Sequence, residues 1–223
     1  EGMIIAGLAV GATMGYIYLR SEYPLSKVVL NDAIETAKAQ NYLGPDICGS
    51  GKGFNIEVRI GAGSYVCGEE TAMLESLEGK RGMVRAKPPL PAHVGLFGKP
   101  TVINNVLSLA SVPIILDKGG DYYKDFGIGR SRGTIAFQLA GNVRCGGLVE
   151  KAFGISLGAL INDFGGGTWS GKPVKAAQVG GPLGAYLSQD DFELPLDYEA
   201  FSEAGAVLGH GGIVIFDETA NMK

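Results

Sequence analysis

The chain has 223 residues, of which 19% are charged, and its formal net charge at pH 7 is −4. This length suits one large or two small globular domains, and the acidic balance argues against a broad nucleic-acid-binding face. Glycine is over-represented, with 36 residues in short runs that have no period, which indicates many tight turns rather than a collagen-like or disordered chain. No apolar stretch reaches membrane-spanning length, so direct membrane insertion is not expected.

The first half of the chain alternates helical and strand patterns. Helices are expected at residues 3–12 and 26–39, and strands at residues 16–19 and 54–60. This alternation predicts an α/β fold in which helices cover a sheet. A further helix is expected from Glu70 to about Leu77, ended by Gly79, and another from a cap at Thr101 to about Leu116.

The most informative segment is the glycine-rich turn at residues 61–70, GAGSYVCGEE, between a strand and a helix. Such a turn brings main-chain N–H groups close to a phosphate or an electron-rich ring. Its adjacent carboxylates, Glu69 and Glu70, would repel a phosphate, and they suit a site that orients ribose hydroxyls or a ring N–H. Neither G-x-G-x-x-G nor G-K-[ST] occurs here. The alternative is a structural turn whose acidic residues complement the helix dipole.

Two later segments are candidate walls of a ligand site. Residues 81–91 form a basic loop that its prolines should keep extended and on the surface, either beside an anionic ligand or as a solvated connector. Asn104 and Asn105 lie in the first turn of the apolar helix that is expected after Thr101. Their amides need hydrogen-bond partners there, and either a ligand or local capping of the helix would supply them.

The pattern changes near Gly120, and a domain boundary is expected between residues 117 and 132. Strands are expected at residues 134–139, 148–152 and 174–179, with a helix at residues 157–164 between the second and third. Two strands, a helix and further strands are the order of a β-grasp module. Residues 196–223 contain a helical pattern at 198–204 and a strand pattern at 213–216, without an obvious closing element.

The three cysteines, Cys48, Cys67 and Cys145, are far apart and form no C-x-x-C pair. With only two histidines beside them, a structural zinc or iron–sulfur site within this chain is not expected. The apolar start of the chain is short, begins with an acid and is unlike a signal peptide. Unpaired cysteines without such a signal favour a cytoplasmic location. Each cysteine is expected to be a small buried hydrophobic residue.

Several long, ordered motifs make this chain resemble a known family. They are GAGSYVCGEETA at 61–72, KPPLP at 87–91, GLFGKPT at 95–101 and NNV at 104–106. In these motifs the chain resembles the NADH-oxidising FMN flavoprotein subunit shared by complex I, NAD-reducing hydrogenases and NAD-dependent formate dehydrogenases. The resemblance covers essentially the whole chain. It implies the C-terminal part of a Rossmann-like FMN- and NADH-binding domain at 1–125, a soluble-ligand-binding β-grasp domain at 126–195, and a connector toward an iron–sulfur helical domain at 196–223.

The resemblance also implies roles for individual residues. Gly68, Glu69 and Glu70 would border the FMN isoalloxazine and the nicotinamide stacked on it, with Glu69 and Glu70 as the catalytic residues. The other implied cofactor-binding residues are Tyr65 and Lys87, toward the dinucleotide, and Ile103, Asn104, Asn105 and Ser108, along the flavin and its phosphate. Leu90 occupies a position where the family often has an aromatic residue, so it would pack against a base without stacking.

The implied function is hydride transfer between NAD(H) and FMN, followed by electron transfer to iron–sulfur clusters. The implied partners are iron–sulfur subunits of a larger complex, with no metal ligand in this chain and no nucleic-acid partner. The family's first flavin loop and its cluster cysteines are expected outside this chain, so the isolated fragment is expected to be inactive and to bind FMN weakly. Residues 129–134 and 180–186 resemble formate dehydrogenase β subunits more than they resemble complex I subunits. Complex I and hydrogenase diaphorase subunits, or a non-catalytic docking fragment, are the alternatives.

Overall fold

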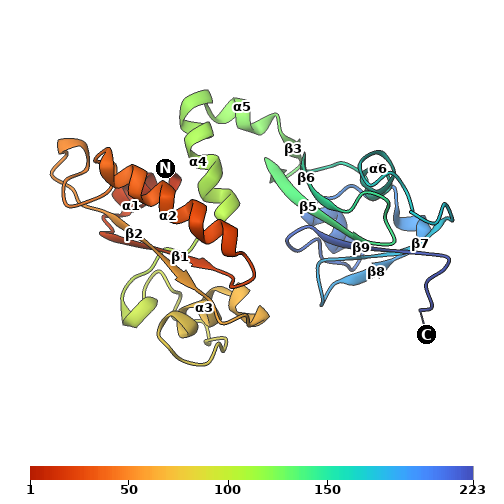
Figure 1. The fold of residues 1–223 in the computed structure, drawn as a ribbon, viewed down its shortest axis with the longest axis horizontal. Helices are drawn as coiled ribbons and strands as arrows, with labels where there is room; N and C mark the ends of the chain where they lie inside the picture. Colours follow the sequence, from red (N-terminus) through yellow and green to blue (C-terminus); the bar gives the residue numbers. More distant parts are fainter. Residues whose placement is uncertain (223) are drawn as a thin grey trace. The chain divides into compact units, whose positions relative to one another are not determined.

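The computed structural model describes residues 1–222 and has a mixed α/β fold that divides into two compact units (Figure 1). The first unit is Glu1–Pro113 and the second begins at Ile114, inside the helix α4 (Val106–Lys118). This division is earlier than the boundary expected at residues 117–132. The two units divide partway along α4, whereas the sequence pattern changes only at the glycines that end this helix.

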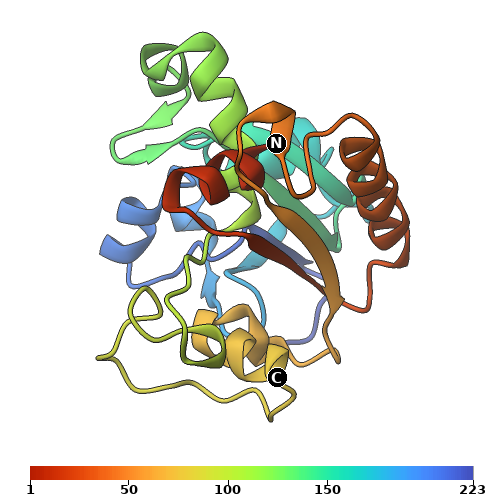
Figure 2. The ribbon, with the colours of Figure 1, turned by 90° about the vertical axis from the view of Figure 1, so that its left-hand side faces the viewer.

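Two parallel strands form the centre of the first unit. The strands β1 (Met14–Leu19) and β2 (Asn55–Ile60) pair in register from Met14–Asn55 to Leu19–Ile60. Figure 2 shows them between the helices α1 (Gly2–Val10) and α2 (Pro24–Ala39). These elements agree with the helices and strands expected at residues 3–60. The helix α3 (Glu70–Leu77) follows the carboxyl end of β2.

The core of the first unit is built around Phe54, which is 2% exposed and immediately precedes β2. Ile34, Leu43 and Ile47 are also buried in this cluster. Glycine is needed at two positions beside the Phe54 ring, because an added Cβ would lie 2.5 Å from the ring at Gly7 and 2.8 Å from it at Gly15. The remaining regular segments of this unit are the short 3-10 turns η1 (Ile47–Gly49), η2 (Tyr65–Gly68) and η3 (Leu96–Gly98).

A five-stranded sheet forms the second unit, in the order β6-β5-β9-β7-β8. Its strands are β5 (Thr134–Gly141), β6 (Gly147–Ala152), β7 (Val174–Val179), β8 (Ala185–Leu187) and β9 (Gly212–Asp217). The central pair, β5 and β9, is parallel, and the other pairs are antiparallel. The helical segments are α5 (Gly120–Lys124), α6 (Leu157–Ala159), which continues into η4 (Leu160–Phe164), η5 (Gln189–Asp191) and α7 (Tyr198–Glu203). A short hairpin, β3 (Gly127–Ile128) and β4 (Ser131–Arg132), precedes the sheet.

Residues 196–223 are expected to form a connector, but residues 196–222, the part that the structure describes, belong to the second unit. β9 lies between β5 and β7 at the centre of the sheet, and Phe201, Leu208 and Ile215 are at most 1% exposed in the core of the second unit. The sequence shows a strand pattern there, but its partner β5 lies more than seventy residues earlier in the chain. Local patterns cannot reveal such a distant pairing.

The cysteines differ in their environments. Cys67 is buried, and its Sγ lies so close to Gly82 that a Cβ there would approach it to 2.7 Å. The prediction of burial is therefore confirmed for Cys67. It is wrong for Cys48 and Cys145, which are exposed in turns.

Among residues 1–222, no group of three or more His, Cys, Asp or Glu residues is arranged to hold a metal ion. Across the same residues, every helix is too short or too polar to cross a membrane.

Candidate functional site

The turn at residues 61–70 joins β2 to α3 through η2. Two of its glycines have structural reasons to be glycine. A Cβ at Gly61 would lie 2.6 Å from the Tyr18 hydroxyl oxygen, and Gly63 has a left-handed φ of 91°. Gly68 has neither constraint, because an added Cβ would meet no protein atom within 4 Å and its φ lies outside the left-handed region. The backbone at Gly68 is therefore open to a close approach from outside the chain.

Glu69 caps the start of α3. Its Oε2 accepts hydrogen bonds from the Thr71 hydroxyl at 2.5 Å, the Thr71 N–H at 2.9 Å and the Ala72 N–H at 2.8 Å. Burial acts to raise the pKa of Glu69, but the hydrogen bonds from Thr71, Ala72 and Lys87 outweigh it and hold that pKa below its usual value. The alternative interpretation, in which an acidic residue stabilises the start of the helix, therefore applies to Glu69. Its carboxylate accepts hydrogen bonds from N–H groups that have no partner within the helix.

Glu70 is held from a distant part of the chain. The Lys87 ammonium donates to Glu70 Oε1 at 2.5 Å and to Glu69 Oε1 at 3.3 Å. The exposed fractions of the three side chains are 34% for Lys87, 32% for Glu69 and 39% for Glu70. The hydrogen bond to Glu70 is the main cause of the raised pKa of Lys87. These three side chains, here called the carboxylate–lysine cluster, carry one net negative charge and lie partly open to solvent.

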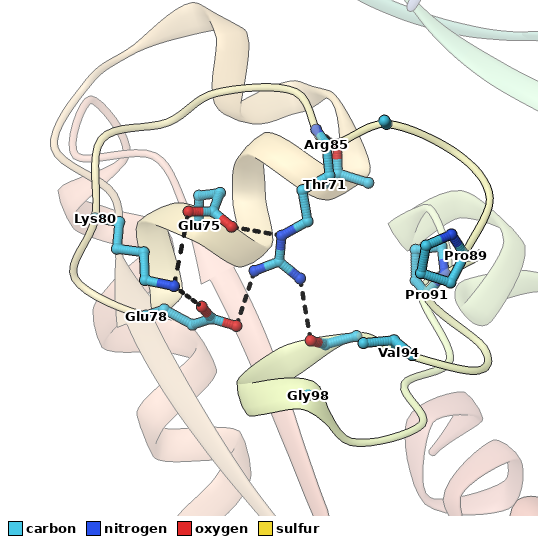
Figure 3. Close-up of a pocket in the computed structure, with 11 residues that line it drawn as sticks. Thr71, Glu75, Glu78, Lys80, Arg85, Pro89, Pro91, Val94 and Gly98 are labelled. Carbon is cyan, nitrogen blue, oxygen red and sulfur yellow. Dashed lines mark hydrogen bonds and ion pairs between the residues drawn. The ribbon is translucent and has the colours of Figure 1, made fainter.

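A second network fastens the loop that carries Lys87 to α3 (Figure 3). The Arg85 guanidinium donates to Glu75 Oε1 at 2.5 Å, to Glu78 Oε1 at 2.8 Å and to the Gly95 carbonyl oxygen at 3.1 Å. Lys80 donates to Glu78 Oε2 at 2.8 Å. The bonds from Lys80 and Arg85 lower the pKa of Glu78 to about 2. The network borders a pocket of about 300 Å³. The remaining lining residues are Thr71, Ala86, Pro89, Pro91, Val94 and Gly98.

Sequence reasoning missed this network. Glu75 lies in the last turn of α3 and Glu78 is its C-cap, three residues later, so the two carboxylates lie on one side of the helix end, which is a detectable signal. Their partner Arg85 lies in an irregular loop, where no periodic pattern indicates the direction of a side chain. Of the three cations at residues 81–87, Lys87 joins the carboxylate–lysine cluster and Arg85 joins the network. Arg81 is exposed and has no hydrogen bond or ion pair in the described part of the chain.

The asparagine segment differs from the expectation. α4 begins at Val106, and Thr101 is not its cap, because the Thr101 hydroxyl accepts from the Leu96 N–H and donates to the Lys99 carbonyl oxygen. Asn105 is the capping residue, since its Oδ1 accepts from the Leu107 N–H at 2.8 Å. Local capping therefore accounts for Asn105. Asn104 and Ser108 are exposed, and neither side chain has a hydrogen-bond partner among residues 1–222.

The structure brings part of the expected site together. Hydrogen bonds join Glu69, Glu70 and Lys87, and Tyr65 and Gly68 belong to the same turn. Tyr65 is 48% exposed and Leu90 is 52% exposed. The second expected group consists of Ile103, Asn104, Asn105 and Ser108. Within residues 1–222 no hydrogen bond or ion pair joins this group to the carboxylate–lysine cluster.

Comparisons with known proteins agree with the resemblance. The family model for the Nuo51 FMN-binding domain matches residues 1–114. The chain is 46% identical over 218 residues to the NADP-reducing hydrogenase subunit HndC of Solidesulfovibrio fructosivorans, covering 98% of this chain and 44% of that protein. It is 43% identical over 222 residues to a subunit of the NADH-quinone oxidoreductase of Rhizobium meliloti, covering 100% of this chain and 53% of the relative.

The fold has a counterpart among solved structures. A crystal structure of an NAD+-reducing [NiFe]-hydrogenase in the air-oxidised state aligns with a TM-score of 0.82 and 35% sequence identity, over 98% of this chain and 35% of that chain. The chain spans about half the length of the two relatives, at 44% and 53%. On the match over residues 1–114, the chain belongs to the Nuo51 FMN-binding domain family.

Proposed function

We propose that this chain is part of the FMN- and NAD(H)-binding region of an electron-transfer oxidoreductase subunit. The carboxylate–lysine cluster beside the open backbone of Gly68 carries this proposal. Glu69 is committed to the cap of α3, whereas Glu70 keeps one carboxylate oxygen free of any bond within the described residues. A free carboxylate oxygen beside an accessible main chain suits a ligand with hydroxyl or amide donors, such as a nucleotide.

The residues at this turn fit a flavin. A Cβ at Gly68 would occupy space that the protein leaves empty, and a planar ring could approach the backbone there. Asn104 has an amide with no partner among residues 1–222, so it has donors and an acceptor to offer a polar ring edge. In this proposal Gly68, Glu69 and Glu70 border the flavin and nicotinamide. Ile103, Asn104, Asn105 and Ser108 follow the flavin and its phosphate, while Tyr65 and Lys87 face the dinucleotide.

FMN, when bound, supplies the redox chemistry that links a two-electron nicotinamide to one-electron carriers. This chain's own residues supply position and charge. Lys87 keeps the Glu70 carboxylate in one place, so its free oxygen can orient a donor group of the nucleotide. Glu69 fixes the first turn of α3 and thereby the direction in which the Gly68 backbone points. No side chain in this arrangement needs to act as a nucleophile.

We propose that the second unit is a β-grasp domain. The sheet order β6-β5-β9-β7-β8 supports this topology. Its parallel pair consists of β5 and β9, which are the first and last of these five strands along the chain. A β-grasp surface suits ligand binding or the docking of another subunit. Iron–sulfur protein subunits are the proposed partners, because electrons that leave a flavin one at a time need such carriers nearby.

The subfamily is a separate proposal. The loops at residues 129–134 and 180–186 favour a formate dehydrogenase β subunit, and this stays a prediction. The named relatives are a hydrogenase subunit and an NADH-quinone oxidoreductase subunit, which support the alternatives of a hydrogenase diaphorase or complex I subunit. A cytoplasmic location is part of the same proposal.

The experiment that tests the function uses the full-length protein that contains this chain. Reduction of ferricyanide by NADH and by NADPH is measured after loading with FMN, for the wild type and for Glu70→Gln. An oxidoreductase subunit will reduce ferricyanide, and Glu70→Gln will lower the rate. A docking fragment would bind a partner protein without any such activity, and that result would refute the proposal.

A further inference from the structure

We infer that Arg85 is the positioning residue for Lys87, acting through the loop that carries both. This inference rests on the proposed function, because it concerns how the carboxylate–lysine cluster is set in place for a nucleotide. Among residues 1–222, no hydrogen bond or ion pair joins Arg85 to Glu69 or Glu70, so Arg85 is not part of the cluster. Its guanidinium instead joins α3 to two separate parts of the loop at residues 80–98 (Figure 3).

All three guanidinium nitrogens of Arg85 donate a hydrogen bond. The three nitrogens reach three acceptors, the carboxylates of Glu75 on α3 and of its C-cap Glu78, and the Gly95 carbonyl on the far side of the loop. The Glu78 side chain is only 7% exposed and Arg85 is 24% exposed. Glu78 also accepts from the Phe97 N–H at 2.8 Å, so one carboxylate holds both Arg85 and the later end of the loop. Removing one member of such a low-exposure pair leaves an uncompensated charge.

A second connection leads to the carboxylate–lysine cluster through the Thr71 hydroxyl. The Arg85 main-chain N–H donates to the Thr71 hydroxyl oxygen at 2.9 Å, and that hydroxyl donates to Glu69 Oε2 at 2.5 Å. Thr71 is 1% exposed. Main chain and side chain of Arg85 are therefore both tied to α3, two residues before Lys87. The position of the Lys87 backbone relative to Glu69 and Glu70 follows from these ties.

This arrangement reduces the entropic cost of holding Lys87. A lysine side chain loses conformational entropy when it is fixed, and a mobile backbone would add to that cost. Since the loop is anchored beforehand, the ammonium reaches both carboxylates without ordering the loop as well. Only arginine has a planar fork of donors for three acceptors, so lysine at position 85 would keep the charge and lose the geometry.

The test compares two substitutions with the same charge change in the full-length protein. Arg85→Gln removes the anchor. Arg81→Gln removes a cation from the same loop that has no partner among residues 1–222. Arg85→Gln should raise the KM for NADH roughly tenfold, with a smaller effect on kcat, because the ligand must order the loop. Arg81→Gln should leave both parameters near those of the wild type. Arg85→Lys, which keeps the charge, should give a smaller increase in KM and serves as the second variant if Arg85→Gln does not fold.

A double-mutant cycle separates positioning from general stabilisation. If Arg85 acts through Lys87, Lys87→Gln will raise KM much less in the Arg85→Gln background than in the wild type. Additive effects of the two substitutions would overturn the inference. Amide exchange of residues 82–95 without nucleotide supplies a readout that does not need activity. Faster exchange in Arg85→Gln than in Arg81→Gln supports the anchor even if the protein oxidises no nucleotide, and equal exchange in the two variants refutes it.

Discussion

The Lys87 ammonium lies 2.5 Å from a carboxylate oxygen of Glu70, although the two residues are seventeen positions apart in the chain. The same ammonium lies 3.3 Å from Glu69, whose other oxygen caps α3. Two adjacent residues of the same type therefore have different surroundings. Glu69 is committed to the helix by three donors, whereas Glu70 is held by one cation at the edge of the turn.

This difference predicts opposite results for substitutions at the two glutamates. Glu69→Ala should lower the free energy of unfolding by about 1 kcal/mol, because the N–H groups of Thr71 and Ala72 lose their acceptor. Glu70→Gln should leave stability nearly unchanged and lower kcat/KM for NADH oxidation about tenfold or more in the FMN-loaded full-length protein. Thermal unfolding and ferricyanide reduction measure the two effects. Glu35→Gln, which breaks an exposed ion pair with Lys38 on α2, is the matched control.

The glycines of the turn allow a steric test of the same site. Gly68→Ala should not change stability much, since the new methyl group meets no protein atom within 4 Å. It should weaken flavin or nucleotide binding if a ring approaches the backbone there. Gly61→Ala should destabilise the protein by about 1–3 kcal/mol, because its Cβ would lie 2.6 Å from the Tyr18 hydroxyl oxygen. Unfolding midpoints and FMN titrations distinguish these outcomes. Unchanged FMN and NADH affinities in Gly68→Ala would contradict the placement of the ligand.

Local sequence patterns predicted most of the regular elements. The helix at residues 70–77 and the strand at residues 174–179 match α3 and β7, because hydrophobic periodicity and flanking glycines report local structure. The failures concern distant or irregular contacts. The role of β9 depends on pairing with β5 across more than seventy residues, and the Arg85 network depends on side-chain directions in a loop. Thr101 illustrates a third cause, since its hydroxyl bonds within a turn rather than to a helix start.

Asn104 and Asn105 are expected to separate stability from cofactor binding. Asn105→Ala should cost about 0.5–2 kcal/mol of stability, because its Oδ1 caps α4 through the Leu107 N–H. Asn104→Ala should leave the unfolding curve unchanged, since its side chain has no partner among residues 1–222. If Asn104 binds the flavin, this variant will retain less FMN after gel filtration of the full-length protein. Flavin absorbance per protein gives the occupancy. Equal FMN occupancy in Asn104→Ala and the wild type would remove Asn104 from the site.

The Glu78 carboxylate predicts a dependence of stability on acid pH. Its pKa is lowered from 4.5 to about 2 in the folded protein. A lowered folded-state pKa gives a contribution to stability that is present above about pH 4.5 and is lost as the pH falls through about 2. Glu78→Gln should therefore reduce the slope of unfolding free energy against pH in this range. Glu69 and Asp217 also have lowered pKa values, so the slope should shrink without vanishing. Urea unfolding at a series of pH values measures it, and an unchanged slope would contradict the Glu78 network.

The position of β9 predicts that residues 196–222 are part of the second unit's core. Ile215 is 0% exposed on β9 and Phe201 is 0% exposed on α7, so Ile215→Ala should cost about 2–5 kcal/mol and Phe201→Ala about 3–5 kcal/mol. Leu183→Ala removes a side chain that is 88% exposed and should change stability by less than about 0.5 kcal/mol. Amide exchange resolved by segment should place the loss of protection in the strands around β9, because β9 hydrogen-bonds to both β5 and β7. If Ile215→Ala and Phe201→Ala were as mild as Leu183→Ala, the segment would behave as a connector after all.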